Sequence, residues 1–163
     1  MPISNQTPAD GGGEVLMFGM GGETFALDAV IVREILDVVP RTAVPGAHRL
    51  AGHVINFRGR VIPLADLRPA FGMEKTADTQ DSRIIVVELT LDDETQLVGL
   101  ATDSVDEVAT LDPAACEDPP AIGMRWPREH VRQLVRRQDG IVVLPDLQAL
   151  FRPIGRSQAA SDA

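Results

Sequence analysis

The residues that could perform chemistry are few, and their spacing assembles no catalytic or metal site. The chain contains three histidines: His48, His53 and His130. They show no His-Glu-x-x-His or His-x-x-x-His spacing, which zinc proteins use to bring ligands together. The single cysteine, Cys116, cannot build a zinc site alone, and the neighbouring Glu117 and Asp118 are expected to raise its pKa and weaken it as a nucleophile. We therefore expect neither a bound metal nor a catalytic thiol.

Other catalytic patterns are also missing from the sequence. There is no Gly-x-Ser-x-Gly nucleophile turn, and GMGGE at 19–23 lacks the Lys-Ser/Thr and the following helix that a phosphate-binding loop requires. The paired acids Asp106 and Glu107 are expected on a strand, where neighbouring side chains point to opposite faces. With no tyrosine, one tryptophan and five phenylalanines, an aromatic-lined ligand pocket is poorly supplied. The sequence thus predicts a protein that is not an enzyme and holds no cofactor.

The charge balance argues against nucleic acid and points to protein partners. The formal net charge of the 163 residues is −9, which repels a phosphate backbone. Ten acidic and no basic residues lie in 84–124, whereas five arginines lie in 125–137. Opposed charge patches steer protein partners, so this asymmetry suggests a binding surface.

The sequence also predicts a cytoplasmic protein that does not insert into a membrane. One cysteine cannot form an intramolecular disulfide, which fits a reducing compartment. The first residues lack the basic start and apolar core of a signal peptide, and no apolar run approaches the roughly 20 residues that span a bilayer. Residues 1–13 are expected to be a disordered tail and 153–163 a flexible one.

Short strands dominate the pattern between these tails. Four β-hairpins are expected, at 14–28, 54–65, 84–101 and 131–145. Asp66 and Asp146 can each cap a short helix, and Asp28 can cap a helical turn. Short strands with frequent turns are typical of a barrel or a sandwich, so the fold class is all-β with short helices.

Two motifs repeat in the same order, which indicates an internal duplication. DLRPAF (66–71) and DLQALF (146–151) share Asp-Leu-x-x-x-Phe directly after a hairpin, and ETFALDAVIVREI and ETQLVGLATDSVDEV both lead from a hairpin turn to a Val-x-Glu-aliphatic ending. One copy is expected to span about 14–73 and the other about 82–152. Each copy is too small for a core of its own, so we predict two small β-barrels joined along an apolar seam.

A continuous set of motifs covers residues 14–152. It runs through EVLMFGMGGETFALDAVIVREIL and AVPGAHRLAGHVINFRGRVIPLADLRPAFGM, and continues through IIVVELTL, VGLATDSVDEVATL and DGIVVLPDLQALF. Its most specific part consists of seven residues: Asn56, Arg58, Gly59, Pro63, Asp66, Leu67 and Arg68. These motifs resemble those of the CheW family, the coupling proteins of bacterial chemosensory arrays.

The resemblance implies a fold and a function. CheW-like domains are two five-stranded, SH3-like β-barrel subdomains packed around a shared hydrophobic core. They do no chemistry and bridge the cytoplasmic tip of a chemoreceptor to the regulatory domain of a CheA-type histidine kinase, which is itself CheW-like. No kinase or receiver segment accompanies the motifs, so the chain resembles the stand-alone adaptor.

The Arg58-Gly59 turn has two interpretations. On the residues alone it is a hairpin turn, with Gly59 supplying a positive φ and Arg58 solvated. In the family this arginine position matters for receptor coupling, and the resemblance favours a partner-binding role for Arg58. Asn56 either satisfies nearby backbone groups or contacts a partner, and Gly59 is expected to be structural in either case.

Three more residues match family positions at a groove that accepts a receptor helix. The resemblance places Val32 and Glu34 on the rim of this groove and Ile84 on its opposite wall. The alternatives are a half-buried strand end for Val32, a solvated position for Glu34 and a core position for Ile84. Such a groove would suit an amphipathic helix hairpin.

Two positions depart from the family pattern, and other functions stay open. His53 stands where the family usually has glycine, and Gln133 stands where glycine is common. Both bear on partner specificity. The alternatives are a CheW-like adaptor of a non-flagellar pathway, with pili or a cyclic nucleotide as output, and a small-ligand-binding β-barrel, which would need a polar pocket instead of an apolar groove.

Overall fold

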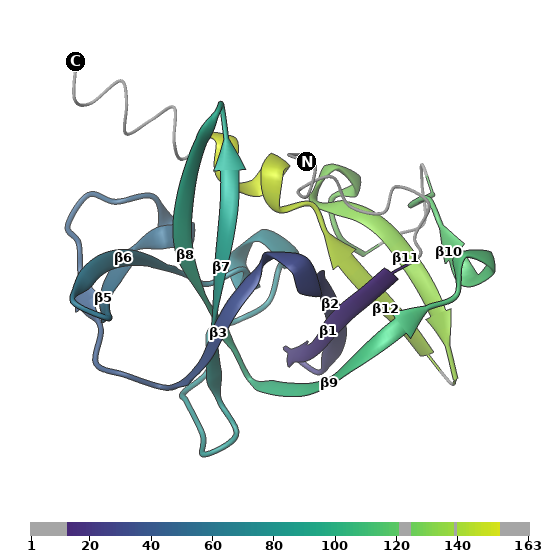
Figure 1. The fold of residues 1–163 in the computed structure, drawn as a ribbon, viewed down its shortest axis with the longest axis horizontal. Coiled ribbons are helices and arrows are strands. Elements are labelled where there is room, and N and C mark those ends of the chain that lie inside the picture. Colours follow the sequence, from purple (N-terminus) through teal and green to yellow (C-terminus); the bar gives the residue numbers. More distant parts are fainter. Residues whose placement is uncertain (1–12, 121–124, 139, 154–163) are drawn as a thin grey trace.

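The protein folds into two curled six-stranded β-sheets (Figure 1). The computed structural model describes residues 13–120, 125–138 and 140–153. Sheet A contains β1 (Gly13–Met20), β2 (Glu23–Asp28), β9 (Ser104–Leu111), β10 (Cys116–Glu117), β11 (Val131–Arg137) and β12 (Gly140–Pro145). Sheet B contains β3 (Val32–Asp37), β4 (Thr42–Ala43), β5 (His53–Phe57), β6 (Arg60–Ala65), β7 (Arg83–Leu91) and β8 (Glu94–Thr102). Sheet B lies on the left of Figure 1 and sheet A on the right.

The two sheets have the same strand order, which agrees with an internal duplication. Sheet A runs β10-β11-β12-β2-β1-β9, and sheet B runs β4-β5-β6-β8-β7-β3, so β1–β6 correspond to β7–β12. Each sheet combines the first hairpin of one copy with the four remaining strands of the other copy. Short parallel pairings join the two copies, between Val142 and Thr24 in sheet A and between Leu64 and Gly99 in sheet B.

The sequence analysis predicts one barrel at 14–73 and the other at 82–152. The two sheets divide the chain differently. The β1–β2 hairpin belongs with β9–β12, and the β7–β8 hairpin belongs with β3–β6. Repeated motifs identify equivalent segments, but backbone pairing decides which copy each hairpin joins. Gly13, expected in a tail, begins β1 and pairs with Leu111, while 1–12 and 154–163 lie outside the described residues.

The strand count is close to the five per subdomain that the resemblance implies. Each sheet has five strands of 5 to 9 residues and one edge strand of two residues, β4 or β10. The prediction of an all-β chain with two small subdomains is confirmed.

The core has three parts, and the largest lies between the sheets. Strand β7 contributes to two of these parts, because it is buried on both faces. Ile85 and Val87 pack in the cluster that includes side chains of both sheets, whereas Ile84 and Val86 pack in the interior of sheet B. All four are 0% exposed. A strand covered on both faces reads as a continuous apolar run, as IIVV does here. The predicted shared core is confirmed.

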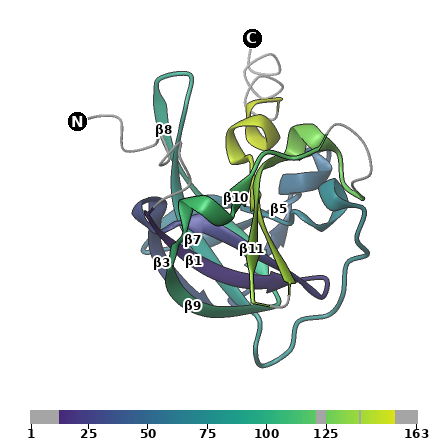
Figure 2. The same ribbon diagram turned by 90° about the vertical axis from the view of Figure 1, so that its right-hand side faces the viewer.

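The two Asp-Leu-x-x-x-Phe motifs form short helices that cover this shared core. The first is a 3-10 helix, η4 (Arg68–Phe71), and the second is an α-helix over 147–153. The Asp66 carboxylate accepts from the N–H of Arg68 at 3.0 Å, and Asp146 accepts from the N–H of Ala149 at 3.0 Å. Helix 147–153 and the β7–β8 hairpin project on the same side of the molecule (Figure 2).

The cap expected from Asp28 is wrong. A 3-10 turn, η2 (Ala29–Ile31), follows Asp28, but the Asp28 side chain makes no capping hydrogen bond to it. Its carboxylate instead accepts from Arg132 of β11 at 3.0 Å. The arginine comes from a strand 104 residues away, so local spacing could not predict this contact.

A buried arginine links the two sheets on the side of η4. Arg68 is 5% exposed, and its guanidinium donates to Asp66 at 3.1 Å and to Asp103, which lies between β8 and β9. The other oxygen of Asp103 accepts from the N–H of Gly21 at 2.8 Å, and the N–H of Asp103 donates to the carbonyl of Gly19 at 2.9 Å. One arginine thus connects η4, the crossover from sheet B to sheet A, and the β1–β2 turn.

Removing this arginine should destabilise the whole fold. Arg68→Ala leaves two carboxylates, 18% and 37% exposed, without their cation, so the loss of unfolding free energy should lie between the about 0–1 kcal/mol of exposed pairs and the about 3–5 kcal/mol of fully buried ones. Arg136→Ala is the matched control, because the Arg136–Glu117 pair is 64% and 52% exposed and such pairs contribute about 0–1 kcal/mol. Urea unfolding of both variants measures the difference. Equal urea midpoints for the two variants would show that Arg68 does not stabilise the contact between the two sheets.

Candidate partner-binding site

The turn between β5 and β6 is built by its backbone conformation. Arg58 has φ 52° and Gly59 has φ 80°, and two positive φ values in a two-residue hairpin loop define the turn whose twist matches that of the strands. The side-chain carbonyl of Asn56 accepts from the N–H of Gly59 at 3.1 Å. Asn56 thus satisfies the turn backbone, which is one of its two expected roles, and Gly59 has the expected positive φ.

Arg58 reaches across the open end of sheet B to Glu34 of β3. Its Nε donates to Glu34 Oε1 at 3.1 Å, and its Nη2 donates to the same oxygen. Its Cζ lies 5.4 Å from the centroid of the Phe57 ring. In the strand order three strands separate β5 from β3, so only the curl of the sheet brings these residues together.

This ion pair positions Arg58 more than it stabilises the fold. The Arg58 side chain is 71% exposed and that of Glu34 33%, and pairs this wet contribute about 0–1 kcal/mol. Two of the five N–H groups of the guanidinium contact Glu34, so an acceptor on a partner can bind the others without breaking the pair. The arrangement presents an exposed cation on the turn, directed toward Glu34 by a weak ion pair.

The other residues expected at a groove are not on one surface. Val32 is half-buried, pairs with Val87 and packs against the shared core. Ile84 is 0% exposed inside sheet B, so its predicted place on a groove wall is wrong and its core alternative holds. The physical reason is that β7 is covered on both faces. The structure therefore brings together Arg58 and Glu34, and it leaves Ile84 out of reach of a partner.

Two exposed apolar residues near this pair escaped the sequence analysis. Val61 is 70% exposed and pairs with Asn56 beside the turn, and Ile35, next to Glu34 in β3, is 43% exposed. The sequence does not reveal the exposure of Val61, because RVIPLA is one apolar run that does not show which residue points outward. Val61 lies on the strand that follows the turn, whereas Ile35 points to the face of β3 opposite Glu34.

Comparisons with known proteins decide the family. A model of the CheW-like domain matches residues 14–154. The chain belongs to the CheW family. It is 29% identical over 142 residues to the chemotaxis protein CheW of Rhizobium meliloti (strain 1021), covering 87% of this chain and 89% of that protein. It is 30% identical over 138 residues to the probable chemotaxis protein CheW of Rhizobium etli, covering 85% and 86%.

A solved structure of a CheW scaffolding protein has a similar fold. The crystal structure of the scaffolding protein TtCheW from Thermoanaerobacter tengcongensis superposes with a TM-score of 0.76 at 31% identity, covering 86% of this chain and 88% of that chain. CheW family proteins are scaffold and coupling proteins of chemotaxis, and this chain is one of them. In the part of the chain that the structure describes, no helix is both long and apolar enough to cross a membrane.

The two departures from the CheW family pattern lie in different sheets. His53 begins β5, is half-buried and pairs with Leu64. Gln133 lies in β11 at a register shift after Val131, and its side-chain oxygen is buried with no hydrogen-bond partner among the described residues. Neither residue contacts Arg58 or Glu34 through any hydrogen bond of the described residues.

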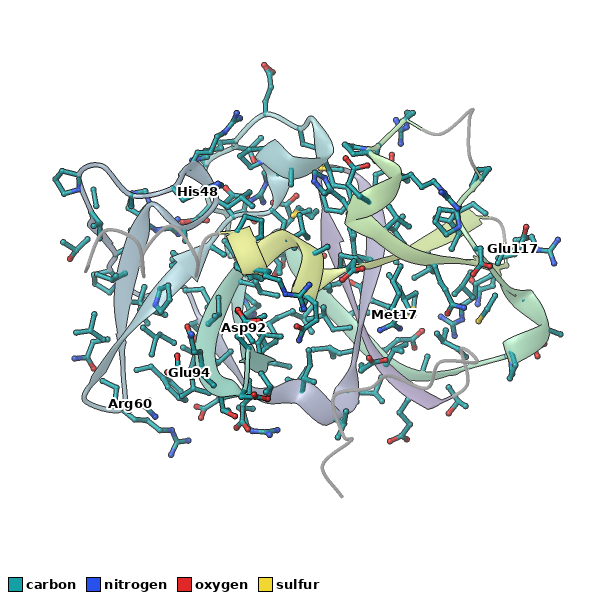
Figure 3. All side chains as sticks on the ribbon, turned by 90° about the horizontal axis from the view of Figure 1, so that it is seen from above. Met17, His48, Arg60, Asp92, Glu94 and Glu117 are labelled. Atoms are coloured by element: carbon teal, nitrogen blue, oxygen red, sulfur yellow. The ribbon has the colours of Figure 1, made fainter. Side chains whose placement is uncertain are left out.

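The remaining candidates for chemistry are dispersed. The Nδ1 of His48 accepts from the N–H of Leu50 at 3.2 Å, and the Nδ1 of His130 lies 2.9 Å from the carbonyl of Ala70. Figure 3 shows His48 and Arg60 on the sheet B half of the molecule and Met17 and Glu117 on the sheet A half. Among the described residues, no three His, Cys, Asp or Glu side chains gather into a group that could hold a metal ion. CheW family proteins are non-catalytic scaffolds; the absence of activity in this chain stays a prediction.

The expected weakening of Cys116 has a different cause from the one inferred. Burial raises the pKa of the Cys116 thiol most, the Asp112 carboxylate raises it further, and the Arg132 guanidinium opposes both. The neighbours Glu117 and Asp118 are not among the causes. A raised pKa leaves less thiolate at neutral pH, which lowers the reactivity of the thiol.

Most arginines of the basic segment 125–137 form ion pairs, several of them at the surface. The arginines of 125–137 pair with acids from distant segments: Arg125 with Glu23, Arg132 with Asp28, Arg136 with Glu117 and Arg137 with Glu107. Arg128 donates to the carbonyl of Pro119 at 3.2 Å. Four of the five arginines thus have counter-ions within the protein, and a steering role of the charge asymmetry stays a prediction.

A substitution in the turn tests its conformation. Gly59→Val should lower the unfolding free energy by about 1–2 kcal/mol, because an L side chain at φ 80° meets the following carbonyl oxygen and a β-branched one resists most. Gly140→Val is the control, since this glycine also borders a hairpin turn, and a Cβ there meets no atom within 4 Å and no positive φ. Thermal unfolding followed by circular dichroism compares them. Equal melting temperatures would contradict the left-handed turn.

Proposed function

We propose that the protein couples the cytoplasmic tip of chemoreceptors to a CheA-type histidine kinase, as a non-enzymatic adaptor, and that Arg58 belongs to its receptor-binding surface. The family supports the coupling role in general terms. The observation that carries the assignment of Arg58 is its pairing with Glu34, which directs an exposed guanidinium on the β5–β6 turn.

The chemistry of this surface fits a helical partner. A receptor tip made of amphipathic helices offers carboxylates and an apolar stripe. The planar guanidinium of Arg58 can bind a carboxylate with two hydrogen bonds, which an ammonium cannot do. Val61, on the strand that follows the turn, supplies exposed apolar surface. This combination corresponds to the binding of a helix by apolar contacts, with a charged residue fixing its position.

Glu34 acts as a positioning residue in this proposal. Its carboxylate is engaged by Arg58 in the free protein, so its own charge is already matched. A receptor acid approaching Arg58 would add a second acceptor to the same guanidinium. The receptor surface should therefore be acidic, and its affinity should fall with salt because the contact is exposed.

Loss of Arg58 should weaken one partner selectively. With a purified receptor cytoplasmic fragment and the purified kinase titrated separately, Arg58→Ala should bind the receptor fragment at least about tenfold more weakly, a change of about 1.4 kcal/mol, and bind the kinase about as tightly as the wild type. Arg136→Ala is the matched control, because it removes an exposed, ion-paired arginine from sheet A.

Glu34→Gln separates positioning from direct contact. If Glu34 only positions Arg58, Glu34→Gln should weaken receptor binding less than Arg58→Ala does. The double variant should then bind the receptor fragment no more weakly than Arg58→Ala alone. Equal weakening of receptor and kinase by Arg58→Ala would contradict the assignment of Arg58. Failure of the wild type to bind either partner would contradict the coupling function itself.

A further inference from the structure

A second arginine borders the β5–β6 turn, and no described residue pairs with it. Arg60 is exposed and lies on the sheet B half of the molecule (Figure 3). Its guanidinium makes no ion pair and no hydrogen bond with any residue that the structure describes. Arg58, by contrast, donates to Glu34 through two of its N–H groups. All five N–H donors of Arg60 are therefore available to a partner.

Strand register places Arg60 on the surface that holds the Arg58–Glu34 pair. Arg60 lies directly opposite Phe57, and directly opposite residues of an antiparallel pair point to the same face of the sheet. The Arg58 guanidinium lies 5.4 Å from the centroid of the same Phe57 ring. Both arginines therefore border one surface at the open end of sheet B, together with Phe57 and Glu34.

The second copy of the repeat lacks both of these arginines. Arg-Gly-Arg at 58–60 corresponds to Gln-Asp-Gly at 138–140, because both triplets precede the Asp-Leu-x-x-x-Phe motif by the same number of residues. Gln138 has φ 49° and Arg58 has φ 52°, so the two turns begin with the same backbone conformation. The turn conformation thus does not require arginine, and the two positive charges are a property of this surface and not of the fold.

The open end of sheet B is a local cationic surface on an acidic protein. Two arginines and Glu34 give this surface a formal charge of +1, whereas the whole chain carries −9. At the equivalent end of sheet A, Arg137 and Glu107 form a neutral pair. Because opposite charges attract, the end of sheet B favours an acidic partner, and Arg60 supplies the charge that no residue of the described chain already matches.

We propose that Arg60 is a second receptor-binding residue, and that Arg58 and Arg60 bind two acidic side chains, three or four positions apart, on one receptor helix. This inference rests on the proposed adaptor function. The two arginines are two residues apart, so their Cα atoms are separated by at most about 7 Å. Side chains three or four positions apart on a helix have Cβ atoms about 5–6 Å apart, which matches this spacing. Each guanidinium can bind a carboxylate through two parallel hydrogen bonds.

The test compares the receptor affinity of the wild type with that of Arg60→Gln and Arg60→Lys. A purified receptor cytoplasmic fragment is titrated into each protein by calorimetry at two salt concentrations. Arg60→Gln should bind at least about fivefold more weakly, and its affinity should depend less on salt, because the surface has lost its unmatched charge. Arg60→Lys keeps the charge without the planar fork, so its affinity should lie between those of Arg60→Gln and the wild type.

A matched control removes an exposed arginine elsewhere in the sheet B half of the chain. Arg49 lies in the 3-10 helix η3 (Arg49–Ala51), and it also makes no ion pair with the described residues. Arg49→Gln should bind the receptor fragment as tightly as the wild type does. A loss equal to that of Arg60→Gln would show that net charge, and not the position of Arg60, determines the affinity.

Charge reversal identifies the receptor residue that Arg60 contacts. Arg60→Glu should weaken binding at least about tenfold. Replacing one acidic residue of the receptor tip with lysine should restore binding to Arg60→Glu and weaken binding to the wild type. A second acidic residue, three or four positions away on the receptor helix, should restore binding to Arg58→Glu in the same way. Restoration of both variants at one receptor position, or at positions with another spacing, would refute the two-acid helix.

The remaining outcomes separate this inference from the proposed function. If the wild type binds the receptor fragment and Arg60→Gln binds it equally tightly, Arg60 does not contact the receptor and the adaptor function stands. A wild type that binds no receptor fragment would overturn both the adaptor function and the role of Arg60.

Discussion

The structure depends on the apolar surface buried between the two sheets, which neither copy of the repeat could bury alone. Phe25 stands near its centre, stacked on Phe18 with ring centroids 5.6 Å apart and meeting Phe71 edge-on at 5.1 Å. Each sheet is completed by the hairpin of the other copy, so a separated copy would lose both strand partners and core cover. This interlocked arrangement fixes the curl of sheet B. The position of the β5–β6 turn opposite β3, and hence the partner-binding site, follows from it.

The repeat also shows which features of that site belong to the fold. Gln138, in the equivalent turn, has φ 49°, close to the 52° of Arg58. Glu107 corresponds to Glu34 and binds Arg137 at 3.2 Å, so an arginine–glutamate pair occurs near the open end of both sheets. The difference is exposure: the Arg58 side chain on the turn is 71% exposed, whereas that of Arg137 within β11 is 30% exposed. The functional inference therefore rests on the pairing of a guanidinium that stays accessible, because the positive φ and an arginine–glutamate pair occur in both copies.

Sequence reasoning succeeded where a feature is local in the chain. The hairpins, the aspartate caps of the two short helices and the positive φ of Gly59 each depend on residues within a few positions. It failed where partners are distant: the exchange of hairpins, the pairing of Asp28 with Arg132 and the burial of Ile84 are decided by sheet pairing. Of the candidate site, the turn and its glutamate partner could be anticipated through the family resemblance. The outward-facing Val61 could not, because RVIPLA carries apolar residues on both its exposed and its buried face and so shows no alternation.

The two ends of the seam show how a duplicated fold tolerates divergence. At one end Arg68 donates to two carboxylates, and at the other Gln148 stands in its place and donates to the carbonyl of Thr90, while Oδ1 of Asp28 and Nε of Arg68 are buried without a partner among the described residues. An unpartnered buried polar atom costs about 1–3 kcal/mol, and more when it belongs to a charged group, whereas one fully buried Leu or Phe contributes about 1.5–3 kcal/mol. The shared cluster contains many such side chains, so the core can carry the defect without loss of the fold.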